Sequence, residues 1–226
     1  MLSLEPAAKD NAPLQILCLG AHADDIEIGC GGTILDILAK RPDTRVHWVV
    51  LSARDDREQE AADSAERFLS GAKDKKIILG NFRDGYFPYV GSEVKDFFEG
   101  LKDLGTPDLI LTHYRHDLHQ DHRMVSDLAW NTFRNHLILE YEVPKYDGDM
   151  GAPNFFVPLA QEICDQKIAG ILDSFVSQRD RYWFTEDTFR SLLRLRGVEA
   201  RSETGYAEAF YARKVTLELQ SRKSAS

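Results

Sequence analysis

The sequence Ala21-His22-Ala23-Asp24-Asp25 follows an apolar run at residues 14–20 and precedes a glycine-rich segment at residues 29–32. The apolar run is short, ends in glycine and is typical of a buried parallel strand, and the segment after it has helical periodicity. One histidine and two acids therefore lie where a strand gives way to a helix. In open α/β sheets, ligands bind at the carboxyl ends of the strands, so this stretch predicts both the fold class and the place of a site.

A second group of histidine and aspartate, His119-Gln120-Asp121-His122, follows another strand-like run at residues 109–112. Because the carboxyl ends of parallel strands meet at the same edge of a sheet, we expect the two groups to lie close together. Our hypothesis is that they hold one divalent metal ion, and that the protein is a hydrolase.

Apolar periodicity predicts that strands and helices alternate along the chain. Strands are expected at residues 14–19, 46–51, 76–79, 108–112, 137–143 and 209–215, and helices at 28–40, 55–69, 93–104, 124–133, 158–175 and 186–196. Residues 83–91 and 145–153 are expected to be loops, the second of them exposed. This alternation predicts an α/β fold with a mostly parallel sheet covered on both faces. Without a repeat or a long linker, we expect one domain over residues 1–226, with its core at about 14–215.

The composition narrows the class of protein. The chain has 226 residues, 43% of them hydrophobic, and a formal net charge of −9, which argues against a nucleic-acid or anionic-membrane partner because both need a basic face. No apolar run approaches the ~18 residues of a membrane span, and the first 13 residues lack the apolar region of a signal peptide. Three cysteines without C-x-x-C spacing favour a reducing, cytoplasmic compartment. The oligomeric state is left open, a homo-oligomer included.

The two groups contain the parts of a catalytic zinc site. Such a site has three protein ligands, often histidine nitrogens and a carboxylate oxygen, and keeps one position for water. His22 and Asp25 are three residues apart on a tight turn, so both can contact one ion, and His122 can supply the third ligand. Zinc lowers the pKa of a bound water to about 7. Iron, cobalt or manganese would also suit histidine and aspartate ligands.

The remaining residues of the two groups have separate expected roles. Asp24 can accept a proton from the attacking water as a general base. His119 can stabilise an oxyanion and protonate a leaving amine, and Asp121 can hydrogen-bond His119 and raise its pKa. Together these parts suffice for the hydrolysis of an amide.

Several of these residues also have ordinary structural interpretations. Asp24 or Asp25 could cap the following helix, and His113 and His116 either line the loop or are structural. The glycines at 29–32 resemble a phosphate-binding turn but lack the G-x-G-x-x-G pattern. The aromatic residues at 86–89 either pack internally or form a platform for a sugar. The metal interpretation rests on the occurrence of two such groups, each directly after a strand.

At these residues the chain resembles the PIG-L/LmbE-like deacetylases, a family of zinc-dependent de-N-acetylases that act on N-acetylglucosamine conjugates. The residues that carry the resemblance are Ala21-His22-Ala23-Asp24-Asp25, Gly29-Cys30-Gly31-Gly32-Thr33 and Asp117-Leu118-His119-Gln120-Asp121-His122-Arg123, with weaker matches at 57–60, 177–178, 196–198 and 206–210. The resemblance covers roughly residues 14–215. It implies a Rossmann-like three-layer sandwich, with its site at the carboxyl ends of the strands.

Carried over by position, the resemblance makes His22, Asp25 and His122 the metal ligands and Asp24 the general base. It gives His119 the role of transition-state stabiliser or acid, with Asp121 behind it. Arg57 matches an arginine that either reaches the substrate or forms a salt bridge on a helix face.

Two departures from the family pattern stand out. Ala23 occupies the position of a proline that would stiffen the turn. Residues 52–56 lack the glycine-rich loop that is usual beside the substrate.

The sequence thus predicts a zinc-dependent hydrolase that removes the acetyl group from an N-acetylated amino sugar or its conjugate and releases acetate and a free amine. Two alternatives stay open. One is a hydrolase of the same fold that acts on a non-sugar amide or an ester. The other is a non-catalytic Rossmann-like module that binds a nucleotide or a partner protein, which would hold no stoichiometric metal.

Overall fold

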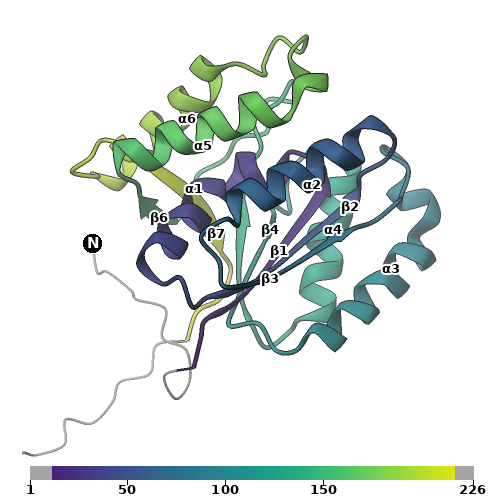
Figure 1. The fold of residues 1–226 in the computed structure, drawn as a ribbon. Coiled ribbons are helices and arrows are strands. Elements are labelled where there is room, and N and C mark those ends of the chain that lie inside the picture. The colour runs from purple at the N-terminus through teal and green to yellow at the C-terminus, as the bar shows by residue number, and fades with distance from the viewer. Residues whose placement is uncertain (1–11, 217–226) are drawn as a thin grey trace, which may run out of the picture.

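The computed structural model describes residues 12–216, so the two ends of the expected domain lie outside the described residues. Its centre is a seven-stranded sheet in the order β3-β2-β1-β4-β5-β7-β6 (Figure 1). The strands are β1 (Gln15–His22), β2 (Arg45–Ser52), β3 (Asp74–Leu79), β4 (Leu109–His113), β5 (Leu137–Tyr141), β6 (Phe155–Pro158) and β7 (Ala207–Ala212). The first five are parallel to one another, and β7 is antiparallel to both β5 and β6. The predicted mostly parallel sheet is confirmed.

Helices cover both faces of the sheet, which gives the expected three layers (Figure 1). On one face lie α1 (Asp25–Lys40), α2 (Asp56–Phe68), α5 (Gln161–Ser174) and α6 (Glu186–Ala200); on the other lie α3 (Gly91–Gly100) and α4 (Gln120–Thr132). Short 3₁₀ helices occupy Phe87–Val90, Leu101–Leu104 and Val176–Gln178. Alternate side chains of β1 enter different cores: Ile16 and Cys18 face the α1 side, and Leu17 and Leu19 face the α4 side, as a strand requires.

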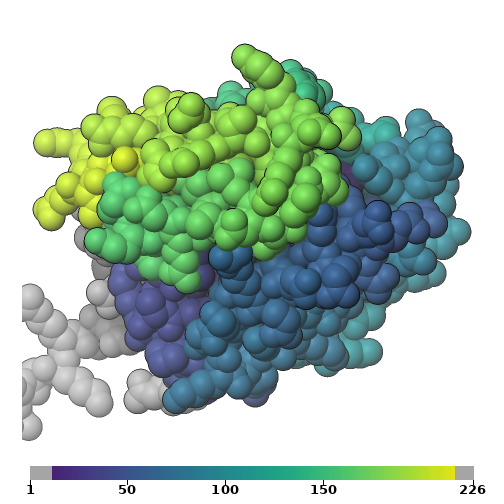
Figure 2. Space-filling model, turned by 45° about the horizontal axis from the view of Figure 1, so that its top comes forward, coloured from purple at the N-terminus to yellow at the C-terminus, as the bar shows by residue number. Residues whose placement is uncertain are grey.

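The C-terminal helices pack on the helices of the first half of the chain. In the space-filling view, the green residues of α5 lie against the blue residues of α2 (Figure 2). Arg67 of α2 pairs with Asp173 of α5 at 2.9 Å, and Ser177 donates a hydrogen bond to Glu60 of α2 at 2.6 Å. The weaker motif matches at 57–60 and 177–178 therefore meet at this interface.

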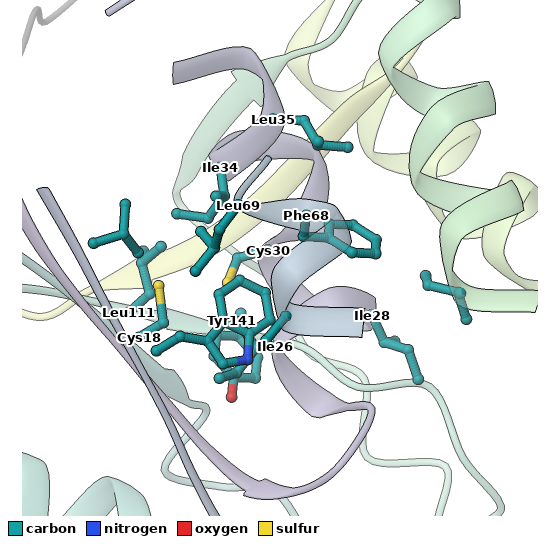
Figure 3. Close-up of a cluster of buried hydrophobic side chains, with 14 of the residues drawn as sticks. Cys18, Ile26, Ile28, Cys30, Ile34, Leu35, Phe68, Leu69, Leu111 and Tyr141 are labelled. Atoms are coloured by element: carbon teal, nitrogen blue, oxygen red, sulfur yellow. The ribbon is translucent and has the colours of Figure 1, made fainter. Parts of the chain in front are cut away.

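The glycines at 29–32 serve close packing. A Cβ atom on Gly29 would lie 2.1 Å from the ring of Tyr141, and one on Gly31 would lie 2.7 Å from Phe68. Figure 3 shows both rings in the buried cluster around α1. At Gly32, Glu208 accepts hydrogen bonds from the amides of Gly32 and Thr33 at 2.8 and 2.6 Å. The glycines allow α1 to pack closely against its neighbours. This packing explains why the segment is rich in glycine, and no bound phosphate is needed to explain it.

A buried ion pair contacts the middle of α1. Lys167 of α5 lies 2.5 Å from the Glu208 carboxylate and donates a hydrogen bond to the carbonyl of Ile28 at 2.6 Å. Both side chains are almost fully buried. α1 is therefore held by polar contacts from α5 and β7 as well as by apolar packing.

Most element boundaries differ from the sequence prediction by a few residues, and two of these differences bear on the candidate site. α1 begins at Asp25 and α4 at Gln120, each about a turn earlier than expected, so parts of both histidine–aspartate groups belong to helices. The expected sheet lacked β6, which lies between the predicted loop and the predicted helix at 158–175. None of the helices in the described part of the chain is both long and apolar enough to cross a membrane.

Candidate active site

The first group forms the turn between β1 and α1. His22 is the last residue of β1, and Asp25 is the first residue of α1. The Asp25 carboxylate accepts a hydrogen bond from the amide of His22 at 2.6 Å, so the turn folds back on itself. Asp24 occupies the position before α1, yet its side chain makes no capping hydrogen bond. Its carboxylate is therefore not used to start the helix.

The second group lies at the start of α4. His119 is the residue before the helix, and its Nδ1 accepts a hydrogen bond from the amide of Asp121 at 3.3 Å. Since α4 already begins at Gln120, His122 lies in its first turn, where the side chain is buried and faces the end of β1. The earlier helix start thus fixes the direction of His122.

The three predicted ligands converge. His22 Nδ1 lies 3.2 Å from His122 Nε2 and 3.4 Å from Asp25 Oδ2, and His122 Nε2 lies 3.4 Å from Asp25 Oδ1. Ligand atoms about 2.0–2.1 Å from a tetrahedral zinc ion lie roughly 3.3–3.4 Å from one another. The spacing of these donor atoms therefore fits one small divalent cation.

Carboxylates orient both imidazoles toward this point. His122 Nδ1 lies 2.9 Å from Asp117 Oδ2, and His22 Nε2 lies 2.9 Å from Asp84 Oδ1 and 3.3 Å from Asp121 Oδ2. A ring nitrogen beside a carboxylate carries the proton. In the neutral rings, the other nitrogen of each can offer its lone pair to a metal ion, and these two nitrogens, His22 Nδ1 and His122 Nε2, lie 3.2 Å apart.

The charges around these histidines favour a cation. Five carboxylates surround them, from Asp24, Asp25, Asp84, Asp117 and Asp121. Burial opposes a charged imidazole at His22, but hydrogen bonds with the carboxylates outweigh it and raise the pKa of His22 well above its ordinary value. The hydrogen bond to His22 lowers the pKa of Asp84 to about 2. Either a proton on His22 or a bound metal cation would balance part of the negative charge of these carboxylates.

Three overlapping groups in the described chain have donor atoms close enough to hold a metal ion. They are His22, His119 and His122; Asp25, His113 and His122; and His22, Asp84 and Asp121. His22 and His122 each belong to two of these groups. Two of the three predicted ligands therefore lie at the centre of the cluster, and Asp25 belongs to one group, which it shares with His122.

Asp121 does not do what the sequence suggested. Its carboxylate accepts hydrogen bonds from the amides of Gly85 and Phe87, at 2.6 and 3.1 Å, and lies near His22. Only its backbone amide reaches His119. The pKa of His119 is lowered, first by burial and then by the charge of His22. The expected hydrogen bond between the Asp121 carboxylate and His119 is not formed, because the first turn of α4 directs that carboxylate toward residues 85–87. The charge of Asp121 still raises the pKa of His119, but by less than burial and the charge of His22 lower it.

Asp24 lies at the edge of the cluster and is paired with Arg57. Arg57 Nη2 lies 3.1 Å from Asp24 Oδ1. Burial raises the pKa of Asp24, and the charge of Arg57 opposes that rise. Of the two interpretations of Arg57, the salt bridge is present, but it joins α2 to the site and not to a neighbour on the same helix face. A buried carboxylate with a raised pKa is suited to accepting a proton.

Arg57 follows a strained turn. Asp55 has φ 53° and ψ −132°, a backbone conformation that favours glycine. Residues 52–56 are the segment that lacks the expected glycine-rich loop. The chain therefore keeps a glycine-like conformation there without the glycine.

Three residues of the cluster have a role that the sequence reasoning did not assign: Asp84 was not singled out, Asp117 was named only as part of a matched motif, and His113 was left as either loop-lining or structural. His113, the last residue of β4, is fully buried, and its ring stacks on that of His122 with centroids 4.0 Å apart. Its Nε2 accepts a hydrogen bond from the amide of Ala21 at 2.9 Å. Asp84 and Asp117 orient the two ligand histidines, as described above. The position of Asp117 in the matched motif was the one available signal, whereas His116 is exposed and lies outside the cluster.

The aromatic residues at 86–89 divide between the two expected roles. Phe87 is fully buried, and its ring centroid lies 5.9 Å from that of His22. Tyr86 and Tyr89 are exposed. Phe87 therefore packs beneath the site, while the two tyrosines face solvent.

Comparison with known structures agrees with this fold. The chain resembles the N,N'-diacetylchitobiose deacetylase of Pyrococcus horikoshii (23% identity, 88% of this chain and 83% of that one, TM-score 0.68). It also resembles a teicoplanin deacetylase solved in a zinc-inhibited form (16% identity, 88% of this chain and 97% of that one, TM-score 0.69). A third neighbour is the 4-carboxy-2-hydroxymuconate hydratase of Pseudomonas putida KT2440 (17% identity, 92% of this chain and 100% of that one, TM-score 0.72).

At these identities the likeness is one of fold, and no protein of curated function matches the sequence. The family model described as PIG-L, GlcNAc-PI de-N-acetylase, matches residues 17–133, which is more than half of the chain and includes both histidine–aspartate groups. The protein therefore belongs to the PIG-L/LmbE-like deacetylase family.

Proposed function

We propose that the protein is a metal-dependent N-deacetylase that hydrolyses the acetamide of an N-acetylated amino sugar or its conjugate, releasing acetate and a free amine. The observation that carries the proposal is the meeting of two imidazole nitrogens and the Asp25 carboxylate, with these atoms 3.2–3.4 Å apart. Membership of the PIG-L family and the two deacetylases among the structural neighbours support the reaction class.

His22, Asp25 and His122 would hold the cation. Bound there, zinc or a similar divalent ion would polarise a carbonyl and lower the pKa of water. Asp117 and Asp84 orient the two imidazoles through hydrogen bonds to their outer nitrogens, and Asp121 contributes to holding His22. We therefore assign Asp121 to His22 and no longer to His119.

Asp24 is the proposed general base. Its carboxylate is next in sequence to Asp25 and is free of any capping bond, so it can take a proton from the attacking water. Arg57 holds the carboxylate in place through their ion pair. We assign Arg57 first to this contact, and a direct contact with substrate remains a proposal.

His119 is the proposed stabiliser of the tetrahedral intermediate. Because its Nδ1 accepts the amide hydrogen of Asp121, the neutral ring carries its proton on Nε2. That N–H can donate a hydrogen bond to the developing oxyanion. Protonation of the leaving amine would then use the proton that Asp24 has accepted.

The fold alone does not choose this reaction, because a hydratase shares it. The test is therefore chemical. Acetate release should be measured on a panel of N-acetylhexosamines and their conjugates, with simple acetamides and acetate esters in parallel. Activity confined to the simple compounds would favour the non-sugar alternative.

Variants test the assigned residues. His22→Ala should lose the metal that elemental analysis finds in the wild type. Asp24→Asn should keep the metal and lose about two to four decades of kcat. His116→Ala is the matched control, since this exposed histidine lies outside the cluster. This variant should keep the metal content and the kcat of the wild type. Unchanged metal content in His22→Ala would contradict the ligand assignment, and a wild type without stoichiometric metal would favour a non-catalytic module.

A further inference from the structure

Lys145 lies in the segment between β5 and β6, beyond the residues that match the family model. The sequence analysis expected this segment to be an exposed loop. It is a loop and residues 146–148 are exposed, but the Lys145 side chain is only 9% exposed. A buried lysine needs partners for its charge, and its contacts lead to the candidate active site.

The Lys145 ammonium group contacts two buried carboxylates. Its Nζ lies 2.9 Å from Asp117 Oδ2 and 2.6 Å from Asp149 Oδ2. Asp117 Oδ2 is the same oxygen that lies 2.9 Å from His122 Nδ1, while Asp117 Oδ1 accepts a hydrogen bond from the amide of His119 at 2.7 Å. Asp117 is thus held between Lys145 on one side and both histidines of the second group on the other.

Asp149 forms a second link from the same segment. Its Oδ2 accepts a hydrogen bond from the amide of Leu118 at 2.7 Å. Lys145 therefore contacts Asp117, and Asp149 contacts the next residue along the chain. The segment after β5 holds this pair of residues through two polar contacts, one turn before His122.

Removal of the lysine would disturb the carboxylate that orients His122. Asp117 and Asp149 both lie within 3 Å of the same nitrogen. Without that positive charge, the two carboxylates would repel each other, and the Asp117 carboxylate would turn away from its present position. That change weakens the hold of Asp117 on His122.

We propose that Lys145 is a positioning residue of the active site, which fixes Asp117 and through it the orientation of His122 as a metal ligand. The inference rests on the proposed metal site and adds a residue outside the matched motifs. Partners of this kind typically change metal affinity about 10–100-fold when removed. Since Lys145 acts one contact further out than Asp117, we expect the lower end of this range.

The experiment measures the affinity for Co²⁺ and the visible spectrum of the Co²⁺ protein, with circular dichroism as the check on folding. Lys145→Met should weaken Co²⁺ binding about tenfold and alter the spectrum, and Lys145→Arg should restore both. Asp117→Asn should weaken binding at least as much. Lys40→Met is the matched control, because Lys40 pairs with Asp36 on the exposed far end of α1 and should bind as the wild type does.

The outcomes separate this inference from the proposed function. If wild-type protein binds no Co²⁺, the metal site itself is refuted. If the wild type binds and a folded Lys145→Met protein shows the same affinity and spectrum, the role of Lys145 is refuted. Should Lys145→Met not fold, Lys145→Gln keeps a hydrogen-bond donor without the charge, and the same weakening or its absence decides the question.

Discussion

Gly29 connects the packing of α1 to the position of the candidate active site, and Gly29→Ala tests that connection. The added Cβ would lie 2.1, 2.5 and 2.8 Å from three ring atoms of Tyr141. The ring has little room to move, because Tyr141 is fully buried and its hydroxyl donates a hydrogen bond to the carbonyl of Leu19 at 2.7 Å. Figure 3 shows Tyr141 among the buried side chains next to α1. Either Tyr141 or α1 must therefore shift.

The magnitude follows from three contributions. Overpacking costs about 1–3 kcal/mol, and loss of the Tyr141 hydrogen bond adds about 1 kcal/mol. Alanine returns up to about 1 kcal/mol of helix propensity. The free energy of unfolding should fall by about 2 kcal/mol, which for a chain of this size lowers Tm by about 4–8 °C. Because Asp25 lies one turn before Gly29 in α1, metal affinity should fall as well.

The assay is urea unfolding of the metal-free protein together with a metal titration. Gly100→Ala is the matched control: Gly100 is also helical, but a Cβ there would meet no atom within 4 Å. It should leave stability unchanged or raise it by up to about 1 kcal/mol. A Gly29→Ala protein as stable as the wild type would refute the packing argument. If Gly29→Ala is less stable but binds metal as tightly as the wild type, the connection between the packing of α1 and the metal site is refuted.

Two further predictions concern buried charges near α1. Lys167→Met leaves the Glu208 carboxylate buried without its cation, so the free energy of unfolding should fall by about 3–5 kcal/mol; a loss no larger than that of Lys40→Met in urea unfolding would contradict this. Glu27 is fully buried, and burial raises its pKa from 4.5 to about 8. Between these values the folded state binds a proton that the unfolded state has lost, so stability falls as pH rises through this window. We therefore expect the free energy of unfolding of Glu27→Gln, measured with a chelator present, to rise by about 2 kcal/mol relative to that of the wild type as the pH increases from 6 to 8. If the two free energies instead change with pH in parallel, the pKa of Glu27 is not raised.

The boundaries that the sequence missed have physical reasons. The missed start of α4 reflects an unusual cap: a histidine ring nitrogen accepts the amide hydrogen, where the common caps are Ser, Thr, Asp or Asn. β6 was missed because Pro158, which favours the first turn of a helix, ends an edge strand instead. A strand of four residues at the edge exists through its pairing with β7, and that pairing joins residues about fifty positions apart.

The site was predictable to the extent that its residues share a motif. His22, Asp24, Asp25, His119 and His122 could be named because they stand in two short groups with recognisable chemistry. Lys145 and Asp84 could not, since each reaches the cluster from a different strand end and neither has a neighbour that indicates a metal. His113 could be named but not assigned, because the sequence left it as either a loop-lining or a structural residue. Charged residues in a loop are usually solvated, and only the fold shows that Lys145 is buried.

The strand order explains why the two groups meet. β1 has β2 on one side and β4 on the other, so the chain direction across the sheet reverses between β1 and β4; this is where α/β sheets form their ligand crevice. The β1–β4 pairing ends at Cys18 and Leu111, and the strands separate beyond it. The His113 ring then accepts the amide hydrogen of Ala21 in the gap. His113 is fully buried between the two strand ends, and its ring stacks on that of His122. Alternation of strands and helices predicts a parallel sheet, but only the order of its strands places these two histidines 3.2 Å apart.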